Sequence, residues 1–303
     1  MFAGDANART EKFMFGISRT TRRYAKERAM FSVLKLAALI NICALLSVCG
    51  FLVWNGAGIL SWEFLTEPPR DSMTAGGIWP CIIGTALLAL GALSVSFPLG
   101  VASAVYLHEY ARSSRFAGYI RLGVNNLAGV PSIIFGLFGM SFFVITCGFG
   151  ISLLSGILTL AVLTLPVVIS TAEEALRQVP LVLREASFAL GASQSQTIVR
   201  VVLPAAMPGM LTGAILGLAR ASGETAVIMF TAAVFFTKSG ASSLFKPVMA
   251  LPNHIYVLAT SGTDIEKTLP LQYGTALVLL LLVIGMNLAA IIIRDRLQKK
   301  QRG

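Results

Sequence analysis

Long apolar runs separated by short charged segments dominate the sequence. Five stretches stand out: Leu36–Trp54, Ile78–Leu107, Leu122–Ala172, Ala206–Phe236 and Leu271–Ile293. About 20 apolar residues in a helix cross a hydrocarbon core of roughly 30 Å. The third stretch holds 51 residues, and the paired glycines of Cys147-Gly-Phe-Gly150 favour a tight turn within it. The pattern therefore predicts an all-α polytopic membrane protein with six transmembrane helices.

Composition supports lipid as the main solvent of this chain. Hydrophobic residues make up 55% of it, charged residues 13%, and the mean hydropathy is +0.77, values outside the range of soluble globular proteins. No soluble domain fits between the apolar runs. We expect a basic cytoplasmic tail over residues 1–35, a transmembrane domain over residues 36–293, and a second basic cytoplasmic tail over residues 294–303.

The distribution of positive charge predicts the topology. Of 24 Lys and Arg residues, nineteen fall on the side of the two termini, four on the other side, and Arg220 inside a span. Cytoplasmic loops carry this excess in membrane proteins, so both termini are expected in the cytoplasm. The same bias accounts for the net charge of +10 better than nucleic-acid binding does. Some 35 residues precede the first run, which indicates a retained span rather than a signal peptide.

Metal, disulfide and catalytic signatures are missing from the sequence. The four cysteines lie within or at the ends of apolar runs without a CxxC pair, which favours packing roles: Cys43, Cys49, Cys81 and Cys147. No glycine-rich loop leads to Gly-Lys-Ser or Gly-Lys-Thr, the pattern that cradles nucleotide phosphates. The two histidines fall on opposite sides of the predicted membrane. We therefore expect no catalytic residues, no metal, no cofactor bound by this chain, and no enzymatic activity of its own.

The longest internal cytoplasmic segment, about residues 173–205, reads as two short helices. Pro180 would open the first helix, and Gly191 would let the chain turn after it. Its surface would mix apolar and charged side chains, from Leu181, Phe188 and Leu190 to Arg184 and Glu185. Such a surface suits docking to a protein, although a loop lying on lipid headgroups would have a similar composition.

The spacing within this segment is more specific than amphipathicity requires. Glu185-Ala186-Ser187 is followed after three residues by Gly191, and after nine more by Val201-Val-Leu203-Pro204. This resembles the Glu-Ala-Ala, Gly, Ile-x-Leu-Pro signature of permease subunits of bacterial ATP-binding-cassette importers, with Ser187 and Val201 as departures. The resemblance implies a type I importer permease fold and a coupling loop that docks a separate ATPase. It assigns that contact to Glu185, Ala186, Gly191, Leu203 and Pro204.

Two charged residues interrupt the fourth apolar stretch. Counted from Ala206 at 1.5 Å per residue, Arg220 lies roughly 21 Å into a helix, and Glu224 would share its face one turn later. A charge at the bilayer centre costs at least ~2.5 kcal/mol, so this face should line a pathway, or hold a structural ion pair. Small residues recur every four positions beside it and would admit another helix: Gly209, Gly213, Gly217, Ala221 and Thr225.

The chemistry of this pair points to an oxyanion. Arginine presents up to five donors in a planar fork that matches phosphate. A neighbouring carboxylate repels sulfate but can accept the proton that phosphate still carries near neutral pH. We therefore expect phosphate as the substrate, with Glu224 as the group that distinguishes it from sulfate.

A second resemblance agrees with this expectation. Residues 219–226, Ala-Arg-Ala-Ser-Gly-Glu-Thr-Ala, and the segment Gly129-Val-Pro131-Ser132-Ile-Ile-Phe-Gly136 are similar to motifs of phosphate-importer permeases. Of the two related permease families, Phe230-Thr-Ala232 and Leu251–Tyr256 resemble PstA more than PstC, while Val227 stands where proline is expected. The resemblance assigns the substrate pathway to Arg220, Glu224, Thr225, Pro131 and Ser132. A proline kink without substrate contact is the alternative for Pro131.

The resemblance also implies partners and a location. These are a PstC-like second permease, a PstB-like ATPase dimer holding ATP and Mg²⁺, and a PstS-like periplasmic binding protein, assembled in the bacterial inner membrane. Two alternatives remain open on the residues alone. The same machinery could carry sulfate or molybdate, or the chain could serve only as a membrane assembly or sensory subunit.

Overall fold

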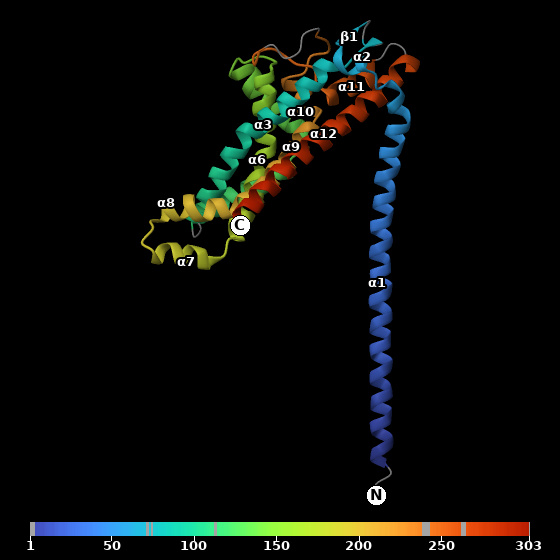
Figure 1. Ribbon diagram of the computed structural model, residues 1–303, viewed down its shortest axis with the longest axis vertical. Helices are drawn as coiled ribbons and strands as arrows, with labels where there is room; N and C mark the ends of the chain where they lie inside the picture. The colour runs from blue at the N-terminus through green and yellow to red at the C-terminus, as the bar shows by residue number, and fades with distance from the viewer. Residues whose placement is uncertain are drawn as a thin grey trace. The chain divides into compact units, whose positions relative to one another are not determined.

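The computed structural model describes residues 4–70, 73, 75–111, 114–237, 243–261 and 265–302 (Figure 1). Contacts divide the chain into two units, residues 1–54 and residues 55–303. The first unit is one long helix, α1 (Gly4–Gly56), whose last residues enter the second unit. Apolar side chains from Met30 to Trp54 are exposed along α1, as expected of a span whose solvent is lipid. The side chains of residues 1–26, most of the basic tail, lie outside the described part.

The second unit is almost entirely helical. Its elements, in chain order, are η1 (Ala57–Ile59), α2 (Trp62–Thr66), β1 (Pro69–Arg70), β2 (Ala75–Gly76), α3 (Trp79–Val105), η3 (Tyr106–Tyr110), α4 (Arg115–Ala128), α5 (Ser132–Gly139), η4 (Met140–Thr146), α6 (Leu153–Arg177), α7 (Leu181–Ala189), α8 (Gln194–Thr197), η5 (Ile198–Val202), α9 (Leu203–Ser222), α10 (Ala226–Thr231), α11 (Leu251–Ser261) and α12 (Ile265–Arg302). The segments η3, η4 and η5 are π-helical turns that continue α3, α5 and α8.

The described helices confirm the predicted membrane architecture. Five are long and apolar enough to cross a membrane: Met30–Ile59, Trp79–Tyr110, Leu153–Arg177, Gln194–Ser222 and Thr268–Lys299. A sixth crossing results if α4 and the helix from Ser132 to Thr146 count as one span. The predicted turn at residues 147–150 is also present, where Gly148 and Gly150 adopt φ of 70° and 67°, values that glycine reaches without the steric cost of a Cβ.

Two spans differ from their predicted form. The third is not straight, because α4 and the helix after it are bent by 104° at residues 129–131. Pro131 is the N-cap of α5 there, and a proline neither donates a backbone hydrogen bond nor lets the residue before it stay helical easily. The fifth span does not continue to Phe236 but stops at Ser222, resumes for the six residues of α10, and then leaves the helical conformation.

The core forms where α3, α6 and α9 pack against one another. Leu88 of α3 and Leu160 of α6 are fully buried there with Leu218 of α9. Along α9 the predicted ridge of small residues faces α6: a Cβ at Gly209 would lie 2.6 Å from Ala175 Cβ, and one at Gly213 would overlap the Thr171 side chain. Small residues thus let the two backbones approach closely, as in other membrane helix pairs.

A second hydrophobic core lies at one end of this unit. It combines Phe64 of α2, Cys81 of α3 and Leu251 of α11 with neighbouring apolar residues, beside a short antiparallel pairing of β1 with β2. Of the four cysteines, all free, Cys81 is the buried one. Figure 1 shows α2, β1 and α11 at this end, and α7, α8 and the final turns of α12 at the other. We refer to these as the outer and inner ends, following the predicted topology.

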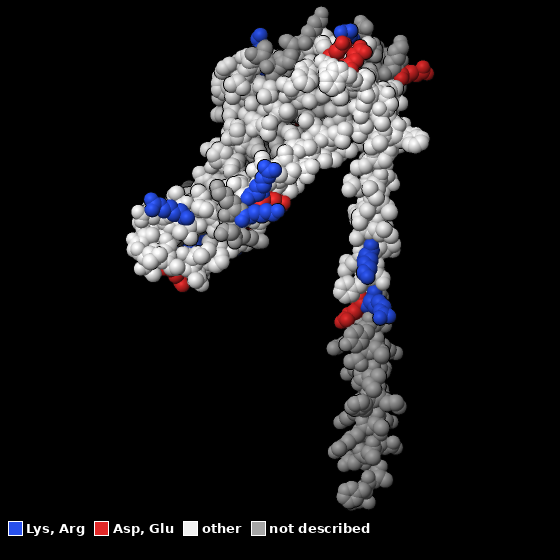
Figure 2. Space-filling view, in the orientation of Figure 1, with Lys and Arg blue, Asp and Glu red and all other residues white. Residues whose placement is uncertain are grey.

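Charged side chains also gather at these two ends. On the face drawn in Figure 2, the Lys, Arg, Asp and Glu side chains of the second unit gather at its two ends, and the band between them is uncharged. An uncharged band between two charged ends is the surface that a bilayer requires.

Candidate functional site

The helix that carries Arg220 ends two residues after it. Ser222 is the last residue of α9, Gly223 follows as the C-cap, and Glu224 and Thr225 lead into α10. The amide of Glu224 donates to the carbonyl of Ala221, only three residues back, at 3.4 Å, which tightens the last turn. The prediction that Arg220 and Glu224 share one face of a continuous helix is therefore wrong. Both residues instead flank a break, and non-helical backbone at membrane depth lies in protein or along a wet cavity.

Arg220 lies beside the face of α9 that packs on α6. It follows Thr212 and Leu216 at four-residue intervals, and these two side chains are exposed, so the stripe they form is not covered by this subunit. Arg220 itself is half-buried. Among the described residues, neither Arg220 nor Glu224 takes part in an ion pair or a hydrogen bond through its side chain. The guanidinium is thus available for a ligand.

The break in the fifth span meets the bend in the third. A Cβ on Gly136 of α5 would lie 3.0 Å from the carbonyl oxygen of Ala226 and 2.9 Å from the Phe230 ring, both of α10. The two segments that resemble phosphate-importer motifs, residues 129–136 and 219–226, are therefore in contact. Ser132 is half-buried at the first position of α5 and Pro131 is exposed before it. No pattern in the sequence indicates that these two segments meet.

The coupling loop folds as predicted in its first half. Pro180 is the N-cap of α7, the helix ends at Ala189, and Gly191 then adopts φ of +81°. In its second half, Ser193 and Gln196 form a capping box that opens α8, but α8 is not a separate helix. It runs through η5 into α9 without a break, so the second half of the loop is the inner end of the fifth span.

The docking residues assigned by resemblance are accessible. Glu185, Ala186 and Gly191 are exposed, Leu203 is half-buried, and Pro204 is exposed at the start of α9. Apolar side chains on and next to α7 are exposed as well, with Leu190 at 89% and Val182 at 70%. The loop lies at the end of the unit where charges gather rather than in the uncharged band. An apolar patch in that position is suited to contact with another protein or with lipid headgroups.

Arg184 does not belong to this surface, contrary to the sequence interpretation. Its side chain is 13% exposed, and Nη1 donates to both carboxylate oxygens of Glu109 at 2.6 Å. Its Nη2 donates to the carbonyl of Leu176 at the inner end of α6, at 3.0 Å. Glu109 sits in η3, and no sequence spacing links it to the coupling loop.

A second arginine joins the neighbouring elements. Arg121 of α4 donates from Nε to Glu173 of α6 at 2.9 Å and from Nη2 to the Leu107 carbonyl at 2.7 Å. Arg121 is one of the nineteen basic residues whose position in the sequence predicts only the topology. The structure shows that it ties α4 to η3, which continues α3, and to the inner end of α6.

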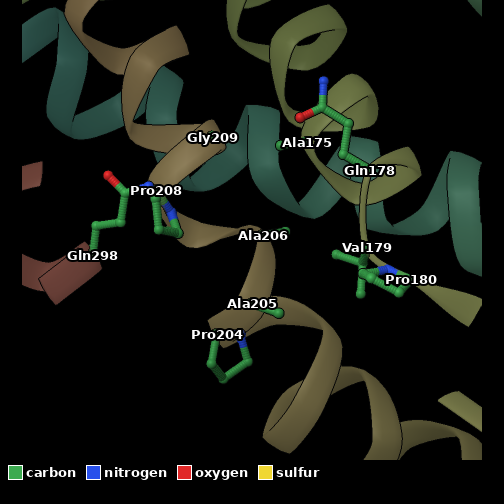
Figure 3. Close-up of a pocket in the computed structure, with 10 residues that line it drawn as sticks. All are labelled: Ala175, Gln178, Val179, Pro180, Pro204, Ala205, Ala206, Pro208, Gly209 and Gln298. Atoms are coloured by element: carbon green, nitrogen blue, oxygen red, sulfur yellow. The ribbon is translucent and has the colours of Figure 1, made fainter. Parts of the chain in front are cut away.

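A cavity of about 560 Å³ opens at the inner end, between the end of α6, the start of α9 and the last turns of α12 (Figure 3). Pro204, Ala205 and Pro208 of α9 line one side, and Val179 and Pro180 face them. None of its ten lining residues is charged; the polar groups are the amides of Gln178 and Gln298. Pro204, which the resemblance assigns to docking, therefore borders an opening between helices rather than a packed core.

The two histidines lie far apart in the fold, His108 in η3 and His254 in α11. In α11, burial lowers the pKa of His254 from 6.5 to about 4, and its Nδ1 is buried without a hydrogen-bond partner among the described residues. The described residues contain no group of three His, Cys, Asp or Glu that could hold a metal ion.

Comparison with known proteins shows the family to which this chain belongs. Residues 96–303 match the family described as "Binding-protein-dependent transport system inner membrane component". The fold is similar to that of the inward-facing MetNI methionine ABC transporter, with a TM-score of 0.57 and 23% identity over 73% of this chain and 94% of that one. The similarity confirms the type I importer permease fold.

Relatives of known name are similar along most of their length. The phosphate transport system permease protein PstA of Xylella fastidiosa (strain Temecula1) is 31% identical over 91% of this chain and 96% of the relative. PstA 1 of Mycobacterium tuberculosis (strain H37Rv) is 42% identical over 80% of this chain and 77% of the relative. These matches confirm the resemblance drawn from the sequence motifs.

Proposed function

Because this chain belongs to the family of inner membrane components of binding-protein-dependent transport systems, we propose that it is the transmembrane permease subunit of an ATP-driven phosphate importer. The observation that carries this proposal is the position of Arg220 at the end of α9, where its side chain has no described partner. A cationic side chain within an apolar helix is costly unless it faces a pathway, and this one stands at a helix break without a protein partner among the described residues.

The position of Arg220 supports a pathway shared with a second permease. The exposed stripe of Thr212 and Leu216 continues to Arg220, so the guanidinium lies at the edge of a surface that another subunit would cover. A second, PstC-like permease seated there would complete a pore with Arg220 on its wall. Phosphate matches the donor geometry of the guanidinium.

Glu224 and Thr225 extend this site along the broken backbone. Glu224 can accept the proton of a monohydrogen or dihydrogen phosphate and would repel sulfate. Pro131 and Ser132 complete the proposed pathway, because their segment contacts α10 through Gly136. Other oxyanions such as molybdate remain the competing cargo.

The coupling loop would transmit the energy of ATP hydrolysis to the transmembrane helices. We propose that Glu185, Ala186, Gly191, Leu203 and Pro204 contact a PstB-like ATPase dimer, which binds ATP and Mg²⁺ and hydrolyses the nucleotide in place of this chain. The exposed apolar residues of α7 support the docking. A PstS-like protein would deliver phosphate at the outer end. Both termini would lie in the cytoplasm, in keeping with the charge asymmetry.

Labelled-phosphate uptake in cells that lack this chain tests the proposal. Wild type should restore uptake, and Arg220→Gln should lower it by at least about 100-fold, since the charged hydrogen bonds to the ion contribute roughly 1.5–3 kcal/mol each. Arg296→Gln, an exposed arginine near the end of α12, is the matched control and should leave uptake unchanged. Full uptake with Arg220→Gln in an assembled complex would remove Arg220 from the pathway.

The cargo is tested separately with Glu224→Gln. Excess sulfate should not compete with labelled phosphate in wild type, and it should compete in the variant. An unchanged preference would assign the discrimination to another residue, and competition by sulfate or molybdate in wild type would change the cargo.

The proposed contact between the coupling loop and the ATPase is tested by co-purifying the ATPase with this chain. Glu185→Lys should reduce the recovered ATPase, and Glu174→Lys, an exposed carboxylate on α6, should not. A solely assembling or sensory role predicts that Arg220→Gln keeps both the complex and full uptake, so loss of uptake in an intact complex excludes it.

A further inference from the structure

The docking helix α7 is held to the rest of the protein almost without apolar packing. None of its residues is buried, although a nine-residue amphipathic helix in a globular domain usually buries one face. Something other than a core must therefore fix its position. Among the described residues, α7 packs on η5 and α8, and its polar side chains add contacts that reach other elements.

Two side chains of α7 make these contacts. Ser187 and Thr197 hydrogen-bond through their hydroxyls at 2.9 Å and tie α7 to α8. Arg184 reaches the transmembrane helices, with Nη1 on both oxygens of Glu109 at 2.6 Å and Nη2 on the Leu176 carbonyl at 3.0 Å. The guanidinium of Arg184 therefore connects α7 both to η3, which continues α3, and to the inner end of α6.

Glu109 collects contacts from both halves of the coupling loop. Its carboxylate accepts from Arg184 of α7, and its backbone carbonyl accepts from Gln194 Nε2 at the start of α8, at 3.2 Å. A displacement of either short helix therefore acts on the same residue of η3. Because α3 packs closely on α6, with Gly91 against Ile157 and Gly100 against Val168, a force applied at η3 is passed to the body of the permease.

Stability alone does not explain this arrangement. The side chains of Arg184 and Glu109 are 13% and 9% exposed, and a buried ion pair is often no better for stability than apolar residues of the same volume. Arg184 also leaves its Nε buried without a hydrogen-bond partner among the described residues, which adds to the cost. What the pair does provide is a short, directional connection between two elements that share no core.

We propose that Arg184 and Glu109 are positioning residues that make the docking helix α7 and the inner ends of α3 and α6 move as one body when the ATPase closes and opens. This inference rests on the proposed function. The link converts movement of the ATPase into movement of the transmembrane helices. Without it, α7 and α9 still follow the ATPase through α8, but η3 and the inner end of α6 no longer move with them, so ATP hydrolysis continues with much less transport.

The test uses the complete importer, with the second permease, the ATPase and the binding protein, in proteoliposomes. Phosphate uptake and ATP hydrolysis are measured together for wild type, Arg184→Gln and Glu109→Gln, using only complexes isolated intact. We expect ATP hydrolysis within about 2-fold of wild type and at least a 10-fold fall in phosphate moved per ATP. The matched control is the exposed ion pair of Arg177 and Glu174, whose Gln variants should keep the wild-type ratio.

Three results would overturn the inference. The first is a ratio of phosphate to ATP that stays at the wild-type value in both variants. The second is a proportional fall of uptake and hydrolysis, as lost folding would cause. The third is failure of both variants to assemble while the control pair assembles. The double variant Glu109→Gln/Arg184→Gln adds a further check. It should be no worse than Arg184→Gln alone, because the link is already broken, and an additional fall would show that the two residues act separately.

A readout without cargo separates this inference from the proposed function. A spin label at Ala189→Cys, with the exposed Cys43 and Cys147 replaced by serine, should be immobile in the wild-type background and mobile with Arg184→Gln. If wild type moves no phosphate but the label responds in this way, the proposed function fails and the link stands. If wild type transports phosphate and the label is equally immobile in both, the link fails and the function stands.

Discussion

Gly136 of α5 lies directly against the backbone of Ala226, so that a Cβ at residue 136 would stand 3.0 Å from the Ala226 carbonyl oxygen. Contacts this short require the neighbour to shift, and here the neighbour is main chain rather than a flexible side chain. The approach joins the bend of the third span to the break of the fifth, two places where the backbone leaves regular helix within the apolar body. Packing at this point therefore fixes how the two irregular segments are oriented.

Substitution of Gly136 should lower uptake without removing any polar group. In Gly136→Val the added carbons would push α10 away from α5, and overpacking of this kind costs about 1–3 kcal/mol. We expect at least a 10-fold loss of phosphate uptake at normal membrane levels of the protein. Gly123→Val, with no atom within 4 Å of its Cβ position, is the control, and equal uptake by the two variants would contradict the prediction.

Loss of the Arg121 guanidinium should loosen the inner end of α4. Arg121→Gln would leave Glu173, whose side chain is 13% exposed, without its cationic partner and the Leu107 carbonyl without its side-chain donor. Since the pair is partly solvated, we expect a loss of roughly 1–3 kcal/mol in the free energy of unfolding. Thermal unfolding in nanodiscs measures it. Arg177→Gln, from an exposed pair, should unfold at the wild-type temperature; a matching drop there would point to a general charge effect.

Gly191 should resist replacement by any residue with a side chain. Its φ of +81° lies in the left-handed region, where a Cβ costs about 1–2 kcal/mol. In Gly191→Ala the end of α7 would therefore change direction and the exposed Leu190 would be displaced. We expect weaker retention of the ATPase during purification, while Gly118→Ala, in open space within α4, should retain it fully.

Acid should destabilise the outer end through His254. Burial lowers its folded-state pKa to about 4 from 6.5, so between these values the unfolded state binds the proton and the folded state does not. The stabilising contribution is complete above pH 6.5 and is lost as the pH falls towards 4, by up to roughly 3 kcal/mol.

Comparison with a non-titrating variant isolates this effect from other acidic groups. The difference in unfolding temperature between wild type and His254→Leu should shift in favour of the variant as the pH falls from 7 to 4.5. A difference that does not depend on pH would show that His254 is protonated equally in both states.

Several features of this protein follow from its sequence because they depend on neighbouring residues alone. Runs of apolar residues longer than a bilayer crossing had to become spans, since lipid satisfies no backbone hydrogen bond. The turn at Gly148 and Gly150 and the limits of α7 between Pro180 and Gly191 follow from the backbone preferences of glycine and proline. The spacing of the coupling-loop motif was likewise readable from the sequence, and the role of its residues in ATPase docking stays a prediction.

Tertiary structure decided what these elements do together. The sequence placed Arg220 and Glu224 on one helical face, but the helix ends at Ser222, and no local residue preference in residues 220–225 requires that. The sequence also placed Arg184 on the docking surface, whereas Glu109, 75 residues away, holds it inward. The spacing of residues along the chain predicts contacts only between near neighbours in one helix or hairpin. The contacts of Gly136 with Ala226 and of Arg184 with Glu109 depend instead on how distant helices pack, which no local pattern encodes.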